Sequence, residues 1–367
     1  DSFIWPDAID LLINAAGQLS TDTDALYRLQ STATCALFDL ARQHGVRVLQ
    51  ISALGAGEQP DIPFLASKAE ADRHLLQSGL PAVVLRPSLV IGPGGTSSQW
   101  LLRLSPLPLA PLLDNHARLQ PLHIDDLCGA VLALLRQWPE QPLVLPLVGP
   151  QAMTQGQLLD HLRHAQGWAP ARYWSLPLPL THLGAWLGQH LGWTALNPQT
   201  LNLARRDNLA SPEPLAATCG YRSAPVNSRL QQWPQRAQSI TSSLQPLVLA
   251  VLVLIWLGTA FVCLGPGFDW GLRIMAEAGV EGWLARLAVI AGALLDALLG
   301  IGLLLGRWRR WALRAQIVLM FGYSLIITLL LPHYWFDPFL AVGKNAAVLL
   351  LSLWLLWLTP FPQEKPG

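Results

Sequence analysis

The chain has 367 residues, of which 52% are hydrophobic and only 13% are charged. Charge this sparse excludes a disordered protein and argues against a wholly water-soluble one. The formal net charge of +1 provides no electrostatic basis for binding nucleic acid. Four cysteines lack any Cys-x-x-Cys spacing, which predicts buried or lipid-facing thiols instead of a metal site or disulfide framework: Cys35, Cys128, Cys219 and Cys263.

The first 150 residues alternate between strand-like and helical segments. Short apolar runs bounded by Gly and Pro predict four strands, at residues 9–14, 46–52, 81–86 and 143–148. Helical periodicity between them predicts three helices, at residues 23–44, 64–77 and 127–136. This alternation predicts an α/β fold with a parallel sheet.

Residues 150–240 are richer in loops, and we interpret them as a subdomain on the substrate side. Thr154 is a predicted N-cap for a helix over 154–165. Two further helical stretches are expected at 181–190 and 198–206. Together these segments complete a predicted water-soluble domain over residues 1–240.

Two pairs of polar residues in this domain suggest chemistry but have simpler interpretations. Asp125 and Asp126 resemble a catalytic carboxylate pair, yet their place at a helix start favours helix capping. His161 and His164 share one helix face, but no third ligand accompanies them, so we expect surface residues and no metal site.

The segment 241–367 contains four apolar runs. They cover residues 244–264, 284–305, 311–331 and 339–358. Each has about 20 residues, the length that an α-helix needs to cross the hydrocarbon core of a bilayer. The sequence therefore predicts an all-α bundle of four transmembrane helices.

Basic residues predict the orientation of these helices. The link between the second and third runs, residues 307–311, holds three arginines, whereas the other two links, 265–283 and 332–338, are mainly acidic. The positive-inside rule then places the arginine-rich link, both termini and the soluble domain in the cytoplasm. We expect a multi-pass protein of the inner or plasma membrane.

Two charged residues fall inside the apolar runs. Asp296 lies near the middle of the second run, where a carboxylate is costly and usually pairs or has a function. Lys344 on the fourth run is a possible partner, although its long side chain can also extend to the membrane surface. A structural pair, a buried neutral acid, and a substrate or proton role all stay open for Asp296.

Five sequence pieces, in order, resemble a known enzyme superfamily. The pieces are Asn14–Gly17, Ile51–Ala56, Phe64–Glu70, the pair Leu85–Ser88 with Gly92–Gly94, and Leu122–Asp126. They are similar to the second half of an extended (NAD-dependent epimerase-like) or atypical short-chain dehydrogenase/reductase. The subgroup that they resemble includes the NADPH-binding accessory subunit of respiratory complex I. The apolar tail resembles the DoxX-like four-helix membrane family.

This resemblance implies a Rossmann-like domain that binds NADP or NAD. By position in the motifs, it implies that Ser52 and Lys68 are catalytic residues that also contact the cofactor. The same alignment assigns the remaining cofactor contacts to Asn14, Ala15, Ala16, Gly17, Pro87 and Ser88. From the residues alone, Asn14 and Gly17 equally suit a simple turn.

Phe64 departs from the superfamily pattern, because it occupies the position of the catalytic tyrosine. A phenyl ring can neither donate nor accept a proton. Two hypotheses follow: a hydride-transferring oxidoreductase with another proton donor, or a non-catalytic nucleotide-binding sensor or assembly factor for a membrane complex.

The glycine-rich turn that meets the pyrophosphate of a dinucleotide is absent from residues 1–60. We therefore expect an N-terminally truncated chain in which the strand at 9–14 forms a bare sheet edge and cofactor binding is compromised. A further apolar segment, residues 176–193, favours core packing or a surface that faces the bilayer and admits a quinone- or isoprenoid-like substrate.

Overall fold

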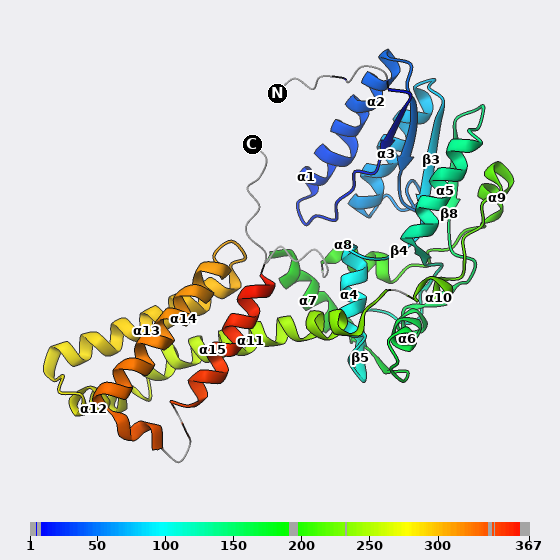
Figure 1. Ribbon diagram of the computed structural model, residues 1–367. Helices are drawn as coiled ribbons and strands as arrows, with labels where there is room; N and C mark the ends of the chain where they lie inside the picture. Colours follow the sequence, from blue (N-terminus) through cyan, green and yellow to red (C-terminus); the bar gives the residue numbers. More distant parts are fainter. Residues whose placement is uncertain are drawn as a thin grey trace. The chain divides into compact units, whose positions relative to one another are not determined.

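The structure is a computed structural model that describes residue 5 and residues 9–190, 197–231, 233–336, 340 and 342–359. It divides into two compact units, residues 1–242 and 243–367, and each is considered by itself. Figure 1 gives the order of the elements along the chain.

A four-stranded parallel sheet forms the centre of the first unit. Its order is β1 (Leu11–Asn14), β2 (Arg47–Ile51), β3 (Ala82–Pro87) and β8 (Leu143–Leu147). The register places Leu12 beside Val48 and Val84 beside Val144. The predicted α/β parallel sheet is thus confirmed, with all four strands where the apolar runs predicted them.

Helices cover both faces of this sheet because the strands are buried on both sides. Val48 packs with side chains of α2 (Thr34–Gln43) and α3 (Pro63–Gln77). Leu49, the next residue, points to the other face and packs with α5 (Ile124–Arg136). Figure 1 shows the sheet between these helices.

The predicted helix over 23–44 is not uniform. It consists of α1 (Thr23–Tyr27), a π-helical segment (Arg28–Ala33) and α2. The π segment directs Gln30 and Ser31 inward, where Gln30 donates a hydrogen bond to the carbonyl of Gln18 at 2.7 Å. Periodicity alone did not indicate this change of pitch.

Among the described residues, β1 pairs with β2 and with no other strand. Its Ile13 side chain is 44% exposed, although strand interiors of a parallel sheet are normally buried. The strand is therefore an edge strand with an apolar residue on its surface.

The second half of this unit is built from short strand pairs and helices. The strands are β4 (Val90–Ile91), β5 (Leu109–Leu112), β6 (Arg118–Leu119), β7 (Leu122–His123), β9 (Met153–Thr154) and β10 (Arg172–Ser175). The helices are α4 (Thr96–Leu104), α6 (Gln155–Ala165), α7 (Leu178–His190), α8 (Pro198–Ala204), α9 (Glu213–Cys219) and α10 (Val226–Arg229). Thr154 caps α6 through a capping box with Gln157, as predicted.

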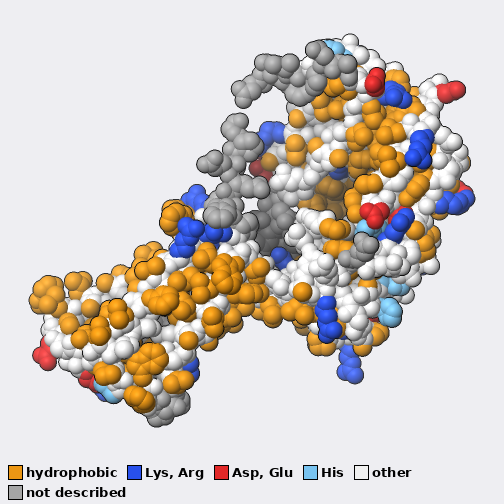
Figure 2. Space-filling view, in the orientation of Figure 1, with side chains coloured by type: hydrophobic (Ala, Val, Ile, Leu, Met, Phe, Trp, Pro, Cys, Tyr) orange, Lys and Arg blue, Asp and Glu red, His pale blue; other side chains and the backbone are white. Residues whose placement is uncertain are grey.

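The second unit is entirely helical in its described residues. It contains the larger part of α11 (Arg236–Leu264), followed by α12 (Phe268–Glu277), α13 (Gly282–Leu304), α14 (Arg309–Leu330), a 3-10 turn (Pro332–Phe336) and α15 (Lys344–Leu358). Three helices, α11, α13 and α14, are long and apolar enough to cross a membrane. Figure 2 shows apolar side chains over most of the visible surface of this unit.

Two features differ from the predicted four spans. The run 339–358 yields a helix only from Lys344, so α15 has 15 residues and is shorter than the predicted span. The polar link 265–283 contains the helix α12, in which Trp270 and Asp269 are both exposed. Composition marked this link as non-spanning but did not reveal its helix.

Candidate functional site

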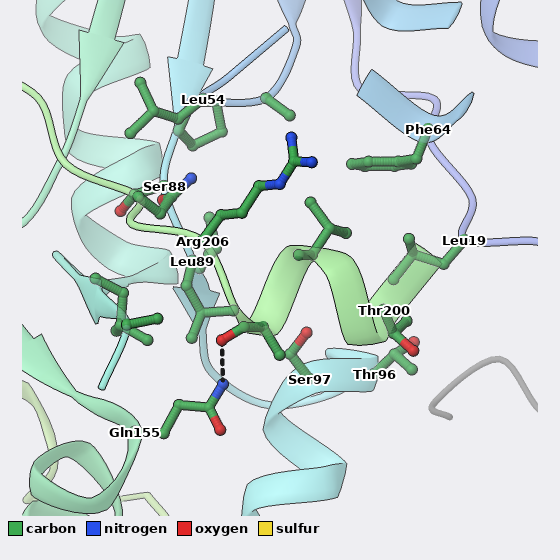
Figure 3. A pocket seen from close by; sticks show the side chains of 18 of the residues that line it. Leu19, Leu54, Phe64, Ser88, Leu89, Thr96, Ser97, Gln155, Thr200 and Arg206 are labelled. Atoms are coloured by element: carbon green, nitrogen blue, oxygen red, sulfur yellow. Dashed lines mark hydrogen bonds between the residues drawn. The ribbon is translucent and has the colours of Figure 1, made fainter. Parts of the chain in front are cut away.

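A cavity of about 390 Å³ lies where β2 and β3 end in the first unit. The carboxyl ends of parallel strands are the usual location of ligand sites in open α/β sheets. Ser52 follows β2, Ser88 follows β3, and Phe64 comes from α3. The opposite walls come from α4, α6 and α8, as Figure 3 shows for Ser97, Gln155 and Thr200.

The cavity wall is mainly apolar: sixteen of the 24 described residues that line it have apolar side chains. Its leucine, valine, alanine and aromatic lining residues are Leu19, Ala53, Leu54, Phe64, Leu65, Leu89, Val90, Trp100, Leu101, Leu113, Ala117, Leu119, Leu158, Leu203 and Ala204. Arg206 is the one charged side chain among the described lining residues, and its guanidinium binds the Asp61 carboxylate at 3.0 Å. Such a wall suits a largely apolar ligand with one or two polar atoms.

Ser52 connects the cavity to a buried carboxylate. Its hydroxyl donates to Oδ2 of Asp72, on α3, at 2.8 Å. The Arg86 guanidinium donates two further hydrogen bonds to the same oxygen, at 3.1 and 2.9 Å. Burial raises the pKa of Asp72 above its ordinary value, while the bonds from Ser52 and Arg86 oppose that rise.

Lys68 lies beneath the same site and joins two strand ends. Its ammonium donates to the carbonyls of Ile51 at 3.1 Å and Ala16 at 3.4 Å. Burial lowers the pKa of Lys68 to about 8, with the Asp72 charge acting in the opposite direction. A side-chain carbon at Gly17 would come within 3.2 Å of the ammonium nitrogen, so a larger residue there would crowd the buried lysine.

Phe64 forms part of the cavity wall one turn before Lys68. Its ring centroid is 5.8 Å from the lysine ammonium, and its backbone N–H donates to Gln199 Oε1 at 3.1 Å. Gln199 also donates to the carbonyl of Ser20 at 3.0 Å, so this side chain ties α8 to the start of α3 and to the segment before α1. The tyrosine position of the resembled superfamily therefore faces the cavity but carries no hydroxyl.

The other predicted site residues divide into two groups. Pro87 and Ser88 line the cavity, and the Ser88 hydroxyl donates to the carbonyl of Gln120. Asn14 does not line it: the Asn14 amide donates to Gln50 at 2.7 Å and its oxygen accepts from the N–H of Ala16. The segment Asn14–Gly17 thus forms a local turn next to Lys68, and Ala15 is exposed within it.

The predicted capping role of Asp125 and Asp126 is wrong. His123 is the N-cap of α5, and its ring accepts from the N–H of Asp125. Asp126 is fully buried and accepts from Tyr221, from the Ala224 N–H and from Arg229, at 2.9, 3.1 and 3.0 Å. Asp126 therefore holds the segment after α9 against α5.

Three contributors to the site were not identified from the sequence: Asp72, Gln199 and Arg206. Asp72 had a usable signal, because it follows Lys68 by four residues and so lies on the same face of α3. Gln199 and Arg206 are more than 100 residues from Phe64 and Asp61, the residues that they bind. No local pattern could have associated them with the cavity.

Asp296 is buried in the second unit, on the inner side of α13, and its Oδ1 has no hydrogen-bond partner in the described structure. Lys344 is the exposed first residue of α15. The described contacts contain no ion pair between these two residues.

Comparison with known proteins gives similarities for both parts of the chain. Residues 253–353 match the model of the DoxX-like family. Over 129 residues the chain is 27% identical to a ceramide reductase of Caulobacter vibrioides, a match that covers 35% of this chain and 41% of that protein. Over 146 residues it is 27% identical to the mitochondrial NADH dehydrogenase (ubiquinone) 1 alpha subcomplex subunit 9 of Arabidopsis thaliana, covering 38% and 36%.

The chain thus spans less than half the length of these two curated relatives. Among solved structures, it is similar to RMD from Pseudomonas aeruginosa complexed with NADPH, with a TM-score of 0.47, 18% identity, and coverage of 65% of this chain and 82% of that one. It is also similar to a UDP-glucose 4-epimerase from Thermotoga maritima, with a TM-score of 0.46, 16% identity, and coverage of 60% and 75%. The resemblance predicted from the motifs is confirmed: residues 253–353 carry a DoxX-like domain, and the part before them matches complex I subunit 9 proteins and a ceramide reductase.

Proposed function

We propose that this protein is a membrane-anchored, NAD(P)(H)-dependent oxidoreductase of the short-chain dehydrogenase/reductase superfamily. Its substrate is an apolar molecule that carries a carbonyl group. The observation that carries this proposal is the mainly apolar cavity that Phe64 and Ser52 both line, with the Ser52 hydroxyl bound to the Asp72 carboxyl group.

The residues around Lys68 fit the nicotinamide and ribose part of the cofactor. Two of the three N–H groups of Lys68 bind backbone carbonyls, so the third can donate to a ribose hydroxyl. Gly17 leaves space beside that ammonium, and Pro87 and Ser88 form the facing wall. When bound, the nucleotide supplies the hydride. The fit does not extend to the pyrophosphate, because residues 1–60 contain no glycine-rich turn.

Ser52 takes the role of proton donor that a tyrosine would have at position 64. Its hydroxyl gives a proton to the carbonyl oxygen as that oxygen gains charge, and Asp72 in its protonated form returns a proton to Ser52. Asp72 then recovers its proton from water.

An apolar substrate is supported by the cavity and by its surroundings. The cavity of about 390 Å³ has the size of a ring or a short segment of an apolar chain, and nine of the described residues that line it are leucines. The helix α7 packs against α8 of the cavity wall and exposes Leu178, Leu180 and Leu183 by more than half. This surface would lie against lipid and admit a quinone, an isoprenoid ketone or a ketolipid. The name of the curated relative, ceramide reductase, agrees with a lipid substrate.

The membrane part holds this domain at the inner or plasma membrane, with both termini and the link 307–311 in the cytoplasm. The arginines of that link support this orientation. Similarity to complex I subunit 9 proteins is consistent with a partner in a membrane complex.

The test measures oxidation of NADPH and of NADH by the full-length protein in nanodiscs, with a panel of quinones, isoprenoid ketones and ketolipids. Ser52→Ala should abolish turnover, whereas Ser97→Ala, which removes another hydroxyl from the cavity wall, should retain it. Tight nucleotide binding without turnover, even in Phe64→Tyr, would refute the enzyme and favour a nucleotide sensor or assembly factor.

A further inference from the structure

The DoxX-like bundle contains buried polar atoms that have no partner in the described structure. They are Oδ1 of Asp296, Oε1 of Gln316, Oγ of Ser352 and Nε1 of Trp256. Their residues are at most 6% exposed and come from four different helices, α13, α14, α15 and α11. An unpaired polar group costs most free energy in a bundle surrounded by lipid. We therefore expect a bound ligand to satisfy these four buried polar atoms.

Contacts between α13 and α14 place Asp296 and Gln316 at nearly the same depth. The Gln316 amide donates to the carbonyl of Leu299 at 3.4 Å, and the Tyr323 hydroxyl lies 3.5 Å from where a side-chain carbon of Gly292 would be. The two contacts are seven residues apart on each helix, and the contact that comes first along α13 comes second along α14. The helices are therefore antiparallel and in register, and Asp296 lies between the two contacts, within one turn of Gln316.

Ser352 lies at this same depth on α15. Arg310, at the start of α14, donates to the carbonyl of Thr359, just after α15. Gln316 is six residues beyond Arg310, and Ser352 is seven residues before Thr359, so the two residues are at matching depths. Ser352 is completely buried, and α14 packs against both α13 and α15.

The chemistry of these three oxygens indicates the class of occupant. Carboxylate, amide carbonyl and hydroxyl oxygens are ligands of hard cations. The amide nitrogen of Gln316 is already used on Leu299, which directs its oxygen away from that bond. One carboxylate balances one positive charge. Leu252, Leu299, Leu313 and Leu355 belong to the apolar core of the same unit and offer no competing ligand.

We propose that Asp296, Gln316 and Ser352 form a binding site for a monovalent metal cation such as Na⁺ in the core of the bundle. The indole N–H of Trp256 is a hydrogen-bond donor and therefore cannot be a ligand of the cation. This N–H, one turn from Asp296 where Leu257 meets Gly300, can donate to a water that completes the ion's shell.

The experiment follows thermal unfolding of the full-length protein in nanodiscs, with NaCl or KCl exchanged for choline chloride at constant ionic strength. A cation that binds only the folded state raises Tm in a saturable manner. We expect this rise in the wild type and its loss in Asp296→Asn. Asp269→Asn, which removes an exposed carboxylate from the same unit, should keep the full rise. Ser352→Ala should weaken the cation dependence at least about tenfold, the effect of one lost ligand near 1.4 kcal/mol.

A second measurement covers the case in which Asp296→Asn fails to fold: equilibrium binding of ²²Na⁺ to the wild type, with saturation at one ion per chain expected. Absence of saturable binding would overturn the proposal. The same holds if Tm responds to pH but not to Na⁺ or K⁺, because Asp296 would then be a buried neutral acid. Neither readout depends on the NAD(P)(H) site, so failure here leaves the proposed oxidoreductase function untouched.

Discussion

Ser52 donates its hydroxyl hydrogen bond to Asp72 at 2.8 Å, and this pair connects the cavity wall to a carboxylate that is only 1% exposed. The serine follows β2, while the aspartate comes from the third turn of α3. A substrate oxygen in the cavity would meet the Ser52 hydroxyl, with the Asp72 carboxyl group directly behind it.

The first prediction concerns this pair. Asp72→Asn preserves the shape of the side chain but cannot return a proton to Ser52. We expect turnover to fall by about 10²-fold, within the range for general acid catalysis, with KM for the substrate little changed. Steady-state kinetics of the full-length protein would measure both constants. If KM rose about 10²-fold while turnover stayed the same, Asp72 would only position the site.

The second prediction restores the missing phenol. Phe64 lines the cavity with its ring 5.8 Å from the Lys68 ammonium. In Phe64→Tyr, a hydroxyl next to that cation becomes more acidic and offers a second proton donor. We expect turnover to rise by about tenfold or more. Phe64→Leu keeps the cavity apolar and should show no gain, which separates proton donation from altered packing.

The third prediction concerns pH. Burial lowers the pKa of Lys68 to about 8, so the folded chain loses this proton at lower pH than the unfolded chain, whose lysine has a pKa of 10.5. The cost of keeping a buried charge is therefore present below pH 8 and is relieved as pH rises from about 8 to 10.5. Above pH 8 the neutral amine also lacks its third N–H.

Nucleotide affinity should follow this loss. We expect the Kd for the preferred nucleotide to rise about tenfold between pH 7 and pH 9.5, because about this much affinity is lost with one hydrogen bond from a charged donor. Isothermal titration would measure it. Lys68→Met should bind weakly at every pH, with a flat profile. A variant that retained the wild-type pH profile would show that another group titrates.

The fourth prediction is structural. Asp126 accepts three hydrogen bonds and is fully buried, so Asp126→Ala would leave Arg229 and Tyr221 without their acceptor. We expect the free energy of unfolding to fall by about 3 kcal/mol. This is at the low end for a broken buried ion pair, because the Arg229 side chain is 38% exposed and water can solvate it. Asp125→Ala, next along the chain but 65% exposed, should cost less than about 0.5 kcal/mol. Thermal unfolding of both variants would compare them, and equal losses would contradict the assignment.

The fifth prediction is topological. Cysteine introduced at Gly306, in the basic link, should be protected from a membrane-impermeant maleimide in intact cells, whereas cysteine at Val280 should react. Permeabilised cells should label both positions. Reaction at position 306 in intact cells would reverse the proposed orientation and place the NAD(P)(H) domain outside the cytoplasm.

Much of the architecture could be predicted because it depends on local periodicity. Runs such as 46–52 and 81–86 are apolar on both faces and flanked by glycine or proline, and such runs form buried parallel strands. The apolar spans of α11, α13 and α14 are longer than a globular core needs, so their class was evident from composition alone. The shorter α15 and the added α12 depend on local turns that hydropathy does not detect.

The sequence by itself determined which residues are apolar, where most of the strands and long helices form, and which motif carries Ser52, Phe64 and Lys68, because these properties follow from near neighbours in the chain. Only the tertiary structure decided that Asp72 binds Ser52, that Asp126 is buried and binds Arg229, and that Gln199 of α8 binds the backbone of Phe64. These contacts join residues up to 135 positions apart, and their formation depends on how helices pack, which no local pattern records.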